Sequence, residues 1–175
     1  MERSGRSGEP AVFDTSSLIF LDLLGYMPLL QRLYQVVVPE AVSKELSVQP
    51  GSPGSGVMSL GWVVHRAPGT ESVRRVGSEP PTVGRGEREV IALGLELSCS
   101  VVLDDRKARL GASRVGLEIT GTLGILLRLH RIGLTSCGIE EDLRLLEEAG
   151  MRISPDLRSI VIEAGRKDEG QQPRR

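Results

Sequence analysis

The chain has 175 residues, of which 39% are hydrophobic and 26% charged, and its formal net charge is −1. This length and composition predict one soluble domain with a single core, and the near-neutral charge excludes a global attraction to nucleic acid or membranes. No apolar run is long enough to cross a membrane, so we expect a soluble, cytoplasmic protein. The two cysteines, Cys99 and Cys137, have no metal-ligand or disulfide spacing, and we expect both to be buried.

Short apolar strands alternate with helices along the chain. In chain order, the expected strands are residues 11–13, 36–38, 101–103 and 117–120, with a short extended piece at 62–65. The expected helices are residues 15–24, 28–33, 39–46, 87–97, 106–114, 121–133, 139–149 and a last one that begins at Ser154-Pro155. This alternation predicts an α/β fold with a parallel sheet and helices on both faces.

One domain is expected over residues 11–164, preceded by a disordered lead at 1–10 and followed by a polar tail at 165–175. Its middle section, about 47–84, is rich in glycine, proline and serine, which predicts irregular structure there. In open parallel sheets, ligands bind at the carboxyl ends of the strands. That edge is therefore where a functional site is expected.

Two of the expected strands end in acids. Asp14 follows the strand AVF, and Asp104 and Asp105 follow the strand VVL. Aspartate is also common in turns and helix caps, so either position alone is explained equally well without a function. Their placement at the same edge of the sheet favours a shared site.

Helical spacing adds two more acids. Glu45 comes four residues after Ala41 and three after Val42, and Glu87 precedes Val90 and Ile91 by the same steps, so both are expected on or beside the sheet-facing side of their helices. The helix dipole alone also favours a glutamate in the first turn. By the same spacing, Glu89 and Glu96 are expected in solvent.

Asp14, Glu45, Glu87 and the Asp104-Asp105 pair are therefore expected to converge. Such a group of carboxylates needs a counterion to remain ionised. With only His65 and His130 in the chain, the all-oxygen donor set favours Mg²⁺ or Mn²⁺ over Zn²⁺. These ions support phosphodiester hydrolysis.

Hydroxyl and basic side chains surround the expected acids. Thr15, Ser16, Thr120 and Thr122 are positioned to hold water or phosphate, or to cap helices. Arg85, Arg88, Arg106 and Lys107 flank the acidic helix starts and either position a phosphate backbone or form a solvated face. His130 is expected to be structural.

Five segments, in this order, resemble the PIN-domain family, specifically its prokaryotic VapC-like branch. They are AVFDTSSLI, VVVPEAVSKEL, GRGEREVIALGLEL, VVLDDRKARLGASRVGLEITGTLGILLRLHRIGL and MRISPDLRSIVIEAG. The resemblance implies a three-layer α/β/α sandwich around a central parallel sheet, and a Mg²⁺- or Mn²⁺-dependent endoribonuclease that acts on RNA. It also implies a homodimer and, for toxin members, a small antitoxin partner.

By position, Asp14 matches the first acid of that family, Glu45 the second and Glu87 the third. The fourth falls on the Asp104-Asp105 pair, where we prefer Asp105 because it directly precedes the basic helix start. The resemblance thus implies Asp14, Glu87 and one or both of Asp104 and Asp105 as metal ligands. A non-catalytic, PIN-like interaction module is the alternative.

Overall fold

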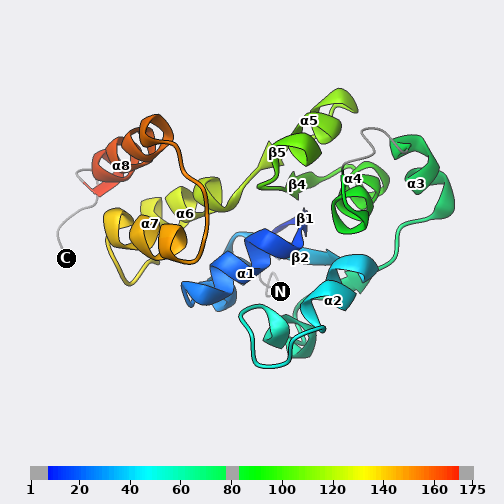
Figure 1. The fold of residues 1–175 in the computed structure, drawn as a ribbon, viewed down its shortest axis with the longest axis horizontal. Coiled ribbons are helices and arrows are strands. Elements are labelled where there is room, and N and C mark those ends of the chain that lie inside the picture. Colours follow the sequence, from blue (N-terminus) through cyan, green and yellow to red (C-terminus); the bar gives the residue numbers. More distant parts are fainter. Residues whose placement is uncertain (1–7, 78–82, 170–175) are drawn as a thin grey trace, which may run out of the picture. The chain divides into compact units, whose positions relative to one another are not determined.

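The computed structural model describes residues 8–77 and 83–169, and the chain divides into two compact units, Met1–Gly121 and Thr122–Arg175 (Figure 1). Each unit is described by itself. No helix in the described ranges has the length and hydropathy of a membrane span.

The first unit is built on a parallel sheet of five strands. These are β1 (Glu9–Phe13), β2 (Tyr34–Pro39), β3 (Val64–Arg66), β4 (Ser100–Val102) and β5 (Ile119–Thr120). They run in the order β3-β2-β1-β4-β5, and every neighbouring pair is parallel. The predicted parallel sheet is therefore confirmed, with β1 at its centre.

Helices connect these strands. They are α1 (Thr15–Leu23), α2 (Glu40–Leu46), α3 (Thr70–Val76), α4 (Arg85–Leu97) and α5 (Arg106–Arg114), with 3-10 helices η1 (Met27–Arg32) and η2 (Ser55–Ser59). From β1 to β3 the chain steps toward one edge of the sheet, whereas from β4 to β5 it steps toward the other. Right-handed crossovers then place helices on both faces, which is the predicted three-layer α/β/α arrangement.

The core explains why β1 is central. Ala11, Val12 and Phe13 are fully buried, as expected for a strand covered on both faces. Phe13 meets Tyr34 of β2 edge to face, with the ring centroids 5.8 Å apart. Helix α4 approaches β4 through Gly94, where a Cβ atom would lie only 2.4 Å from Val101 Cγ1.

Two expectations about irregular chain were wrong. The middle section, expected to be irregular, contains helix α3. Glu96 on α4 holds the chain that leads into α3, because it accepts hydrogen bonds from Arg66 Nη2 at 2.7 Å and from the main-chain N–H of Gly69 at 2.9 Å. The polar tail, expected from residue 165, remains helical to Glu169. The ends of the expected lead and tail, and residues 78–82, lie outside the described residues.

The second unit consists of α6 (Thr122–Arg131), α7 (Ile139–Glu148) and α8 (Pro155–Glu169). Ser154 accepts from the N–H of Leu157 and caps α8, as predicted. His130 is buried and structural: its Nε2 lies 3.0 Å from Asp142 Oδ2, and its Nδ1 lies 3.1 Å from Thr135 Oγ1. These contacts join the end of α6 to α7.

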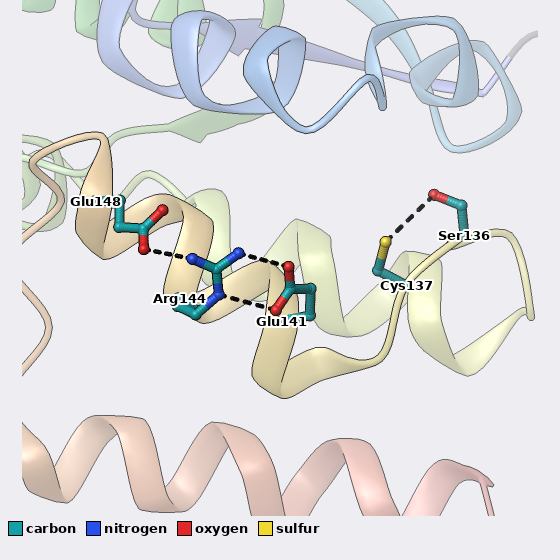
Figure 2. A network of polar contacts seen from close by, with 5 residues as sticks. All are labelled: Ser136, Cys137, Glu141, Arg144 and Glu148. Atoms are coloured by element: carbon teal, nitrogen blue, oxygen red, sulfur yellow. Dashed lines mark hydrogen bonds and ion pairs between the residues drawn. The ribbon is translucent and has the colours of Figure 1, made fainter.

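The surface of α7 carries a separate charged network. Arg144 lies between Glu141, at 2.6 Å from its Nη2, and Glu148 (Figure 2). Just before this helix, Cys137 is exposed and accepts a hydrogen bond from Ser136 at 3.9 Å. Cys99 is only half-buried. The expectation that both cysteines are buried was therefore wrong.

Candidate active site

Asp14 lies where β1 ends and acts as the N-cap of α1. Its side chain is only 3% exposed. Oδ1 accepts from the main-chain N–H of Ser17 at 2.8 Å and from the Ser17 hydroxyl, and Oδ2 accepts from the Ser16 hydroxyl at 3.0 Å and from the N–H of Asp104 at 3.3 Å. Burial, and then the negative charge of Asp104, raise the pKa of Asp14 to about 6, although the bonds from Ser17 and Ser16 oppose this shift.

The two adjacent aspartates after β4 have different roles. The main-chain N–H of Asp104 bonds to Asp14, and its negative charge acts on the Asp14 carboxylate. Its Oδ1 lies against Gly121, where a Cβ atom would be 2.8 Å away. Asp105 is exposed and caps α5, because its Oδ1 accepts from the N–H groups of Lys107 and Ala108, each at 2.9 Å. The geometry therefore favours Asp104, not Asp105, as the partner of Asp14.

Glu45 reaches the same edge from α2. The Thr15 hydroxyl, next to Asp14, donates to Glu45 Oε2. Its carboxylate also lies against the first turn of α4, where a Cβ atom at Gly86 would be 2.9 Å from Glu45 Oε1. Glu45 is exposed rather than sheet-facing, so it borders the site from the solvent side.

Glu87 lies in the first turn of α4 and is half-buried. Its carboxylate folds over the start of its own helix, where a Cβ atom at Gly84 would be 2.3 Å from Oε2.

Within residues 8–77 and 83–169, no three side chains of histidine, cysteine, aspartate or glutamate gather closely enough to hold a metal ion. The predicted acids therefore form one close pair, Asp14 and Asp104, with two single carboxylates on α2 and α4.

The donor set of this pair suits a hard divalent cation. Every candidate ligand atom is a carboxylate or hydroxyl oxygen, which Mg²⁺ and Mn²⁺ prefer. A positive ion beside Asp14 would also offset the burial and the repulsion from Asp104 that raise its pKa. The residues present thus fit such an ion.

The remaining predicted hydroxyls divide into two groups. Thr15 and Ser16 contact the acids directly, as described above. Thr120 ends β5, and its carbonyl accepts from the N–H of Leu103 at 3.0 Å. Thr122 is buried and begins α6 of the second unit. Thr15 and Ser16 therefore each donate a hydrogen bond to a predicted acid.

The predicted basic residues also differ in their contacts. Arg85 Nε donates to Glu89 at 3.1 Å, and Arg88 Nε donates to the carbonyl of Val83 at 3.0 Å. Arg106 and Lys107 are exposed at the start of α5, and in the part of the chain that the structure describes they form no ion pair. They are the cations most available to a phosphate.

Two residues near the site make contacts that were not predicted from the sequence. Arg109 ties together the ends of β4 and β5, because its Nη1 donates to the carbonyls of Leu103 at 2.9 Å and Thr120 at 3.2 Å. Glu89 was expected in solvent but is only 8% exposed, and its Oε2 accepts from the main-chain N–H of Ala41 at 2.9 Å. These contacts have no local sequence signal, because only tertiary packing brings the N–H of Ala41 to Glu89 and the ends of β4 and β5 to Arg109.

Comparison with known proteins gives one family. A family model described as a PIN domain matches residues 10–166. Among solved structures, one similar chain is a PilT N-terminus domain protein from the hyperthermophilic archaeon Sulfolobus solfataricus P2, at 17% identity and a TM-score of 0.42, covering 82% of this chain and 96% of that one. No curated protein matches. The matches identify the PIN domain and do not single out its VapC-like branch.

Proposed function

The chain belongs to the PIN-domain family, a nuclease-type fold, and on that premise we propose that it is a metal-dependent endoribonuclease that hydrolyses phosphodiester bonds in RNA. One observation carries the proposal. Asp14 and Asp104 meet at the carboxyl edge of the parallel sheet, where ligands bind in open α/β folds, and the pKa of Asp14 is raised to about 6 by burial and by that neighbour. Such a pair is stabilised by a cation.

In this proposal, Asp14 and Asp104 hold Mg²⁺ or Mn²⁺, and Glu45 from the end of α2 or Glu87 from the first turn of α4 turns toward the ion to complete the site. Asp105 serves as the cap of α5. When bound, the ion supplies a water nucleophile at neutral pH and offsets negative charge on the phosphate. A metal ion binds to ionised carboxylates. Because the pKa of Asp14 is raised to about 6, the protonation of Asp14 should control metal binding.

The surrounding residues orient these acids and the substrate. Ser17 and Ser16 fix both oxygens of Asp14, and Thr15 fixes Glu45. Arg106 and Lys107, exposed at the start of α5, bind the phosphate backbone, with Arg85 and Arg88 contacting RNA from the start of α4. Thr120 at the end of β5 and Thr122 at the start of α6 keep the supporting roles that were expected from the sequence.

The cellular role proposed for this nuclease is that of a cytoplasmic toxin in a toxin–antitoxin pair, acting as a homodimer and restrained by a small antitoxin. Its support is the sequence resemblance to the VapC-like branch. A small neighbouring reading frame whose product binds this chain and blocks its activity is the expected outcome of a co-expression test. A neighbouring product that binds without affecting RNA cleavage would contradict the toxin role.

The test of the enzymatic proposal is RNA cleavage by the purified protein. Activity should require Mg²⁺ or Mn²⁺, disappear with EDTA, and disappear in Asp14→Asn at unchanged folding by circular dichroism. Cleavage that survives in Asp14→Asn would assign the activity to a contaminant or to another site.

A non-catalytic interaction module is the second candidate, and one observation favours it. Among the described residues the acids do not gather into a group of three, so metal binding would require Glu45 or Glu87 to turn toward Asp14. Calorimetric titration with Mn²⁺ distinguishes the two functions, since the nuclease requires saturable binding below millimolar metal. Absence of such binding would support the interaction module.

A further inference from the structure

A pocket of about 550 Å³ lies in the first unit, between the starts of α2 and α4 and the segment that enters α3. One wall is apolar and is formed by Ala67, Pro68 and Val73. This volume falls in the range of small-ligand sites, which combine apolar walls with a few convergent polar groups. The pocket is distinct from the acidic pair, and none of the roles assigned above uses its apolar wall.

The apolar wall is held in place by Glu96. This carboxylate accepts from Arg66 at 2.7 Å, from the main-chain N–H of Gly69 at 2.9 Å and from the Ser72 hydroxyl at 3.4 Å. These donors come from both sides of Ala67 and Pro68 in sequence. The pocket wall is therefore anchored to α4, the helix that forms the opposite wall.

The opposite wall carries paired charges. Glu89 is nearly buried and accepts one hydrogen bond on each oxygen, from Ala41 N–H at 2.9 Å and from Arg85 Nε at 3.1 Å. Since a carboxylate offers about four acceptor positions, it retains capacity for further donors. The Arg85 side chain is 73% exposed. Its bond to Glu89 is made through Nε, which leaves the two terminal nitrogens of the guanidinium available for a ligand.

A second carboxylate, Glu40, lines the same pocket. Lys44, and to a smaller extent Arg85, hold the pKa of Glu40 below its usual value, so it is ionised at neutral pH. The pocket thus presents carboxylate acceptors and the forked guanidinium donor of Arg85 opposite an apolar wall. This is the pattern for a ligand that has adjacent N–H donors, adjacent acceptors and an aromatic face.

The position of the pocket links it to the acidic site. Helix α2 contributes Glu40 to the pocket and Glu45 to the acidic site, and the first turn of α4 contributes Arg85 to the pocket while Gly86 lies against Glu45. A strand of RNA that crosses the acidic site therefore has a neighbouring place for one base.

We propose that this pocket binds a guanine base of the RNA strand and so selects where the strand is cut, an inference that rests on the proposed ribonuclease function. Guanine carries both required patterns: its N1–H and N2–H groups suit a carboxylate, and its O6 and N7 suit an arginine fork. Pro68 and Val73 supply the apolar contact with the base. Uracil, adenine and cytosine each lack part of this pattern.

Binding of short RNA tests the proposal without relying on cleavage. In an Asp14→Asn background with no divalent cation, fluorescein-labelled oligouridines with a single central G, A, C or U are titrated and followed by anisotropy. The G oligonucleotide should bind about ten-fold more tightly than the others. Val73→Trp, which fills the pocket, should lower that affinity to the level of the U oligonucleotide.

Val48→Trp is the matched control, because Val48 is 75% exposed and lies outside this pocket; it should keep the preference. Arg85→Gln provides a second pocket variant if Val73→Trp fails to fold, and it should also lose the preference. Equal binding of the four oligonucleotides by the parent, no binding of any, or a preference that survives in the folded pocket variant would overturn the guanine site.

Wild-type cleavage with Mn²⁺ is measured separately. Cleavage without a guanine preference would remove the base site and leave the nuclease. A guanine preference without cleavage would remove the nuclease and leave an RNA-binding module with this pocket. The two proposals therefore fail independently.

Discussion

The main-chain N–H of Asp104 donates to the Asp14 carboxylate at 3.3 Å, and the charge of Asp104 is the second cause, after burial, of the raised pKa of Asp14. The neighbour thus stabilises one oxygen of Asp14 through its backbone while repelling it through its side chain. The hydrogen bonds fix Asp14 in place, whereas its ionisation remains costly until a cation is bound.

The first prediction concerns stability and pH. The pKa of Asp14 rises from an ordinary 3.8 to about 6 in the folded state, so between these values the folded chain keeps a proton that the unfolded chain releases. The contribution of Asp14 to the stability of the metal-free wild type should therefore fall as the pH rises from about 4 to above 6, by about 2–3 kcal/mol for a pKa shift of roughly two units.

Urea denaturation in EDTA measures this effect, with Asp14→Asn as the reference. Because asparagine does not titrate, the difference in unfolding free energy between the two proteins should change by that amount between pH 4 and pH 7.5. The amide also alters the contacts with Ser16 and Asp104, but that contribution is the same at each pH. A difference independent of pH would contradict the buried, repelled state of Asp14.

The second prediction separates the adjacent aspartates. Asp104→Asn removes a carboxylate beside Asp14 and should abolish RNA cleavage and weaken Mn²⁺ binding, measured by calorimetry. Asp105→Asn should retain both, because asparagine is also a favourable N-cap for α5, and Asp105→Ala should lower the unfolding free energy by about 1 kcal/mol while keeping activity. Loss of activity in Asp105→Asn alone would reverse the assignment.

The sequence favoured Asp105 as the fourth acid of the site, whereas the geometry favours Asp104. Two acids at the end of a buried strand predicted a site at the carboxyl edge, because parallel strands bring their ends together. Either acid satisfied the spacing, however. The choice follows from which side chain turns toward the N–H groups of Lys107 and Ala108, and no spacing rule determines that.

The fold was more predictable than the site, for a related reason. The runs AVF, VVV and VVL are apolar and short, which specifies buried parallel strands locally. Helix α3 was missed because TESVRRV has little apolar pattern and is held through Glu96. Glu89 was misplaced because its partner, the N–H of Ala41, lies 48 residues away. Long-range hydrogen bonds decided both cases.

The third prediction tests the close approach of α4 to the sheet. A Cβ atom at Gly94 would lie 2.4 Å from Val101 Cγ1 and 3.1 Å from Leu117 Cδ1, so Gly94→Ala should lower the unfolding free energy by about 1–3 kcal/mol through overpacking. Gly111→Ala in α5 is the matched control, since its Cβ would make an ordinary 3.5 Å contact with Ile91. The control should be stabilising by about 0.5–1 kcal/mol in chemical denaturation.

The fourth prediction joins metal binding to protonation. A divalent cation that binds only the folded state raises its stability by RT ln(1 + [L]/Kd), and protons compete with it for Asp14, whose pKa is about 6. Mn²⁺ should therefore raise the melting temperature of the wild type strongly at pH 7.5 and only weakly at pH 5. Differential scanning fluorimetry measures both shifts.

Matched variants make the metal effect specific. Asp14→Asn and Asp104→Asn should lose the Mn²⁺-dependent shift at pH 7.5, because each removes one member of the pair. Glu141→Gln, on the α7 network with Arg144 (Figure 2), should keep it, since that carboxylate belongs to the second unit and already has a cationic partner. A shift of equal size in all these proteins, or one that does not depend on pH, would place the bound metal away from Asp14 and Asp104.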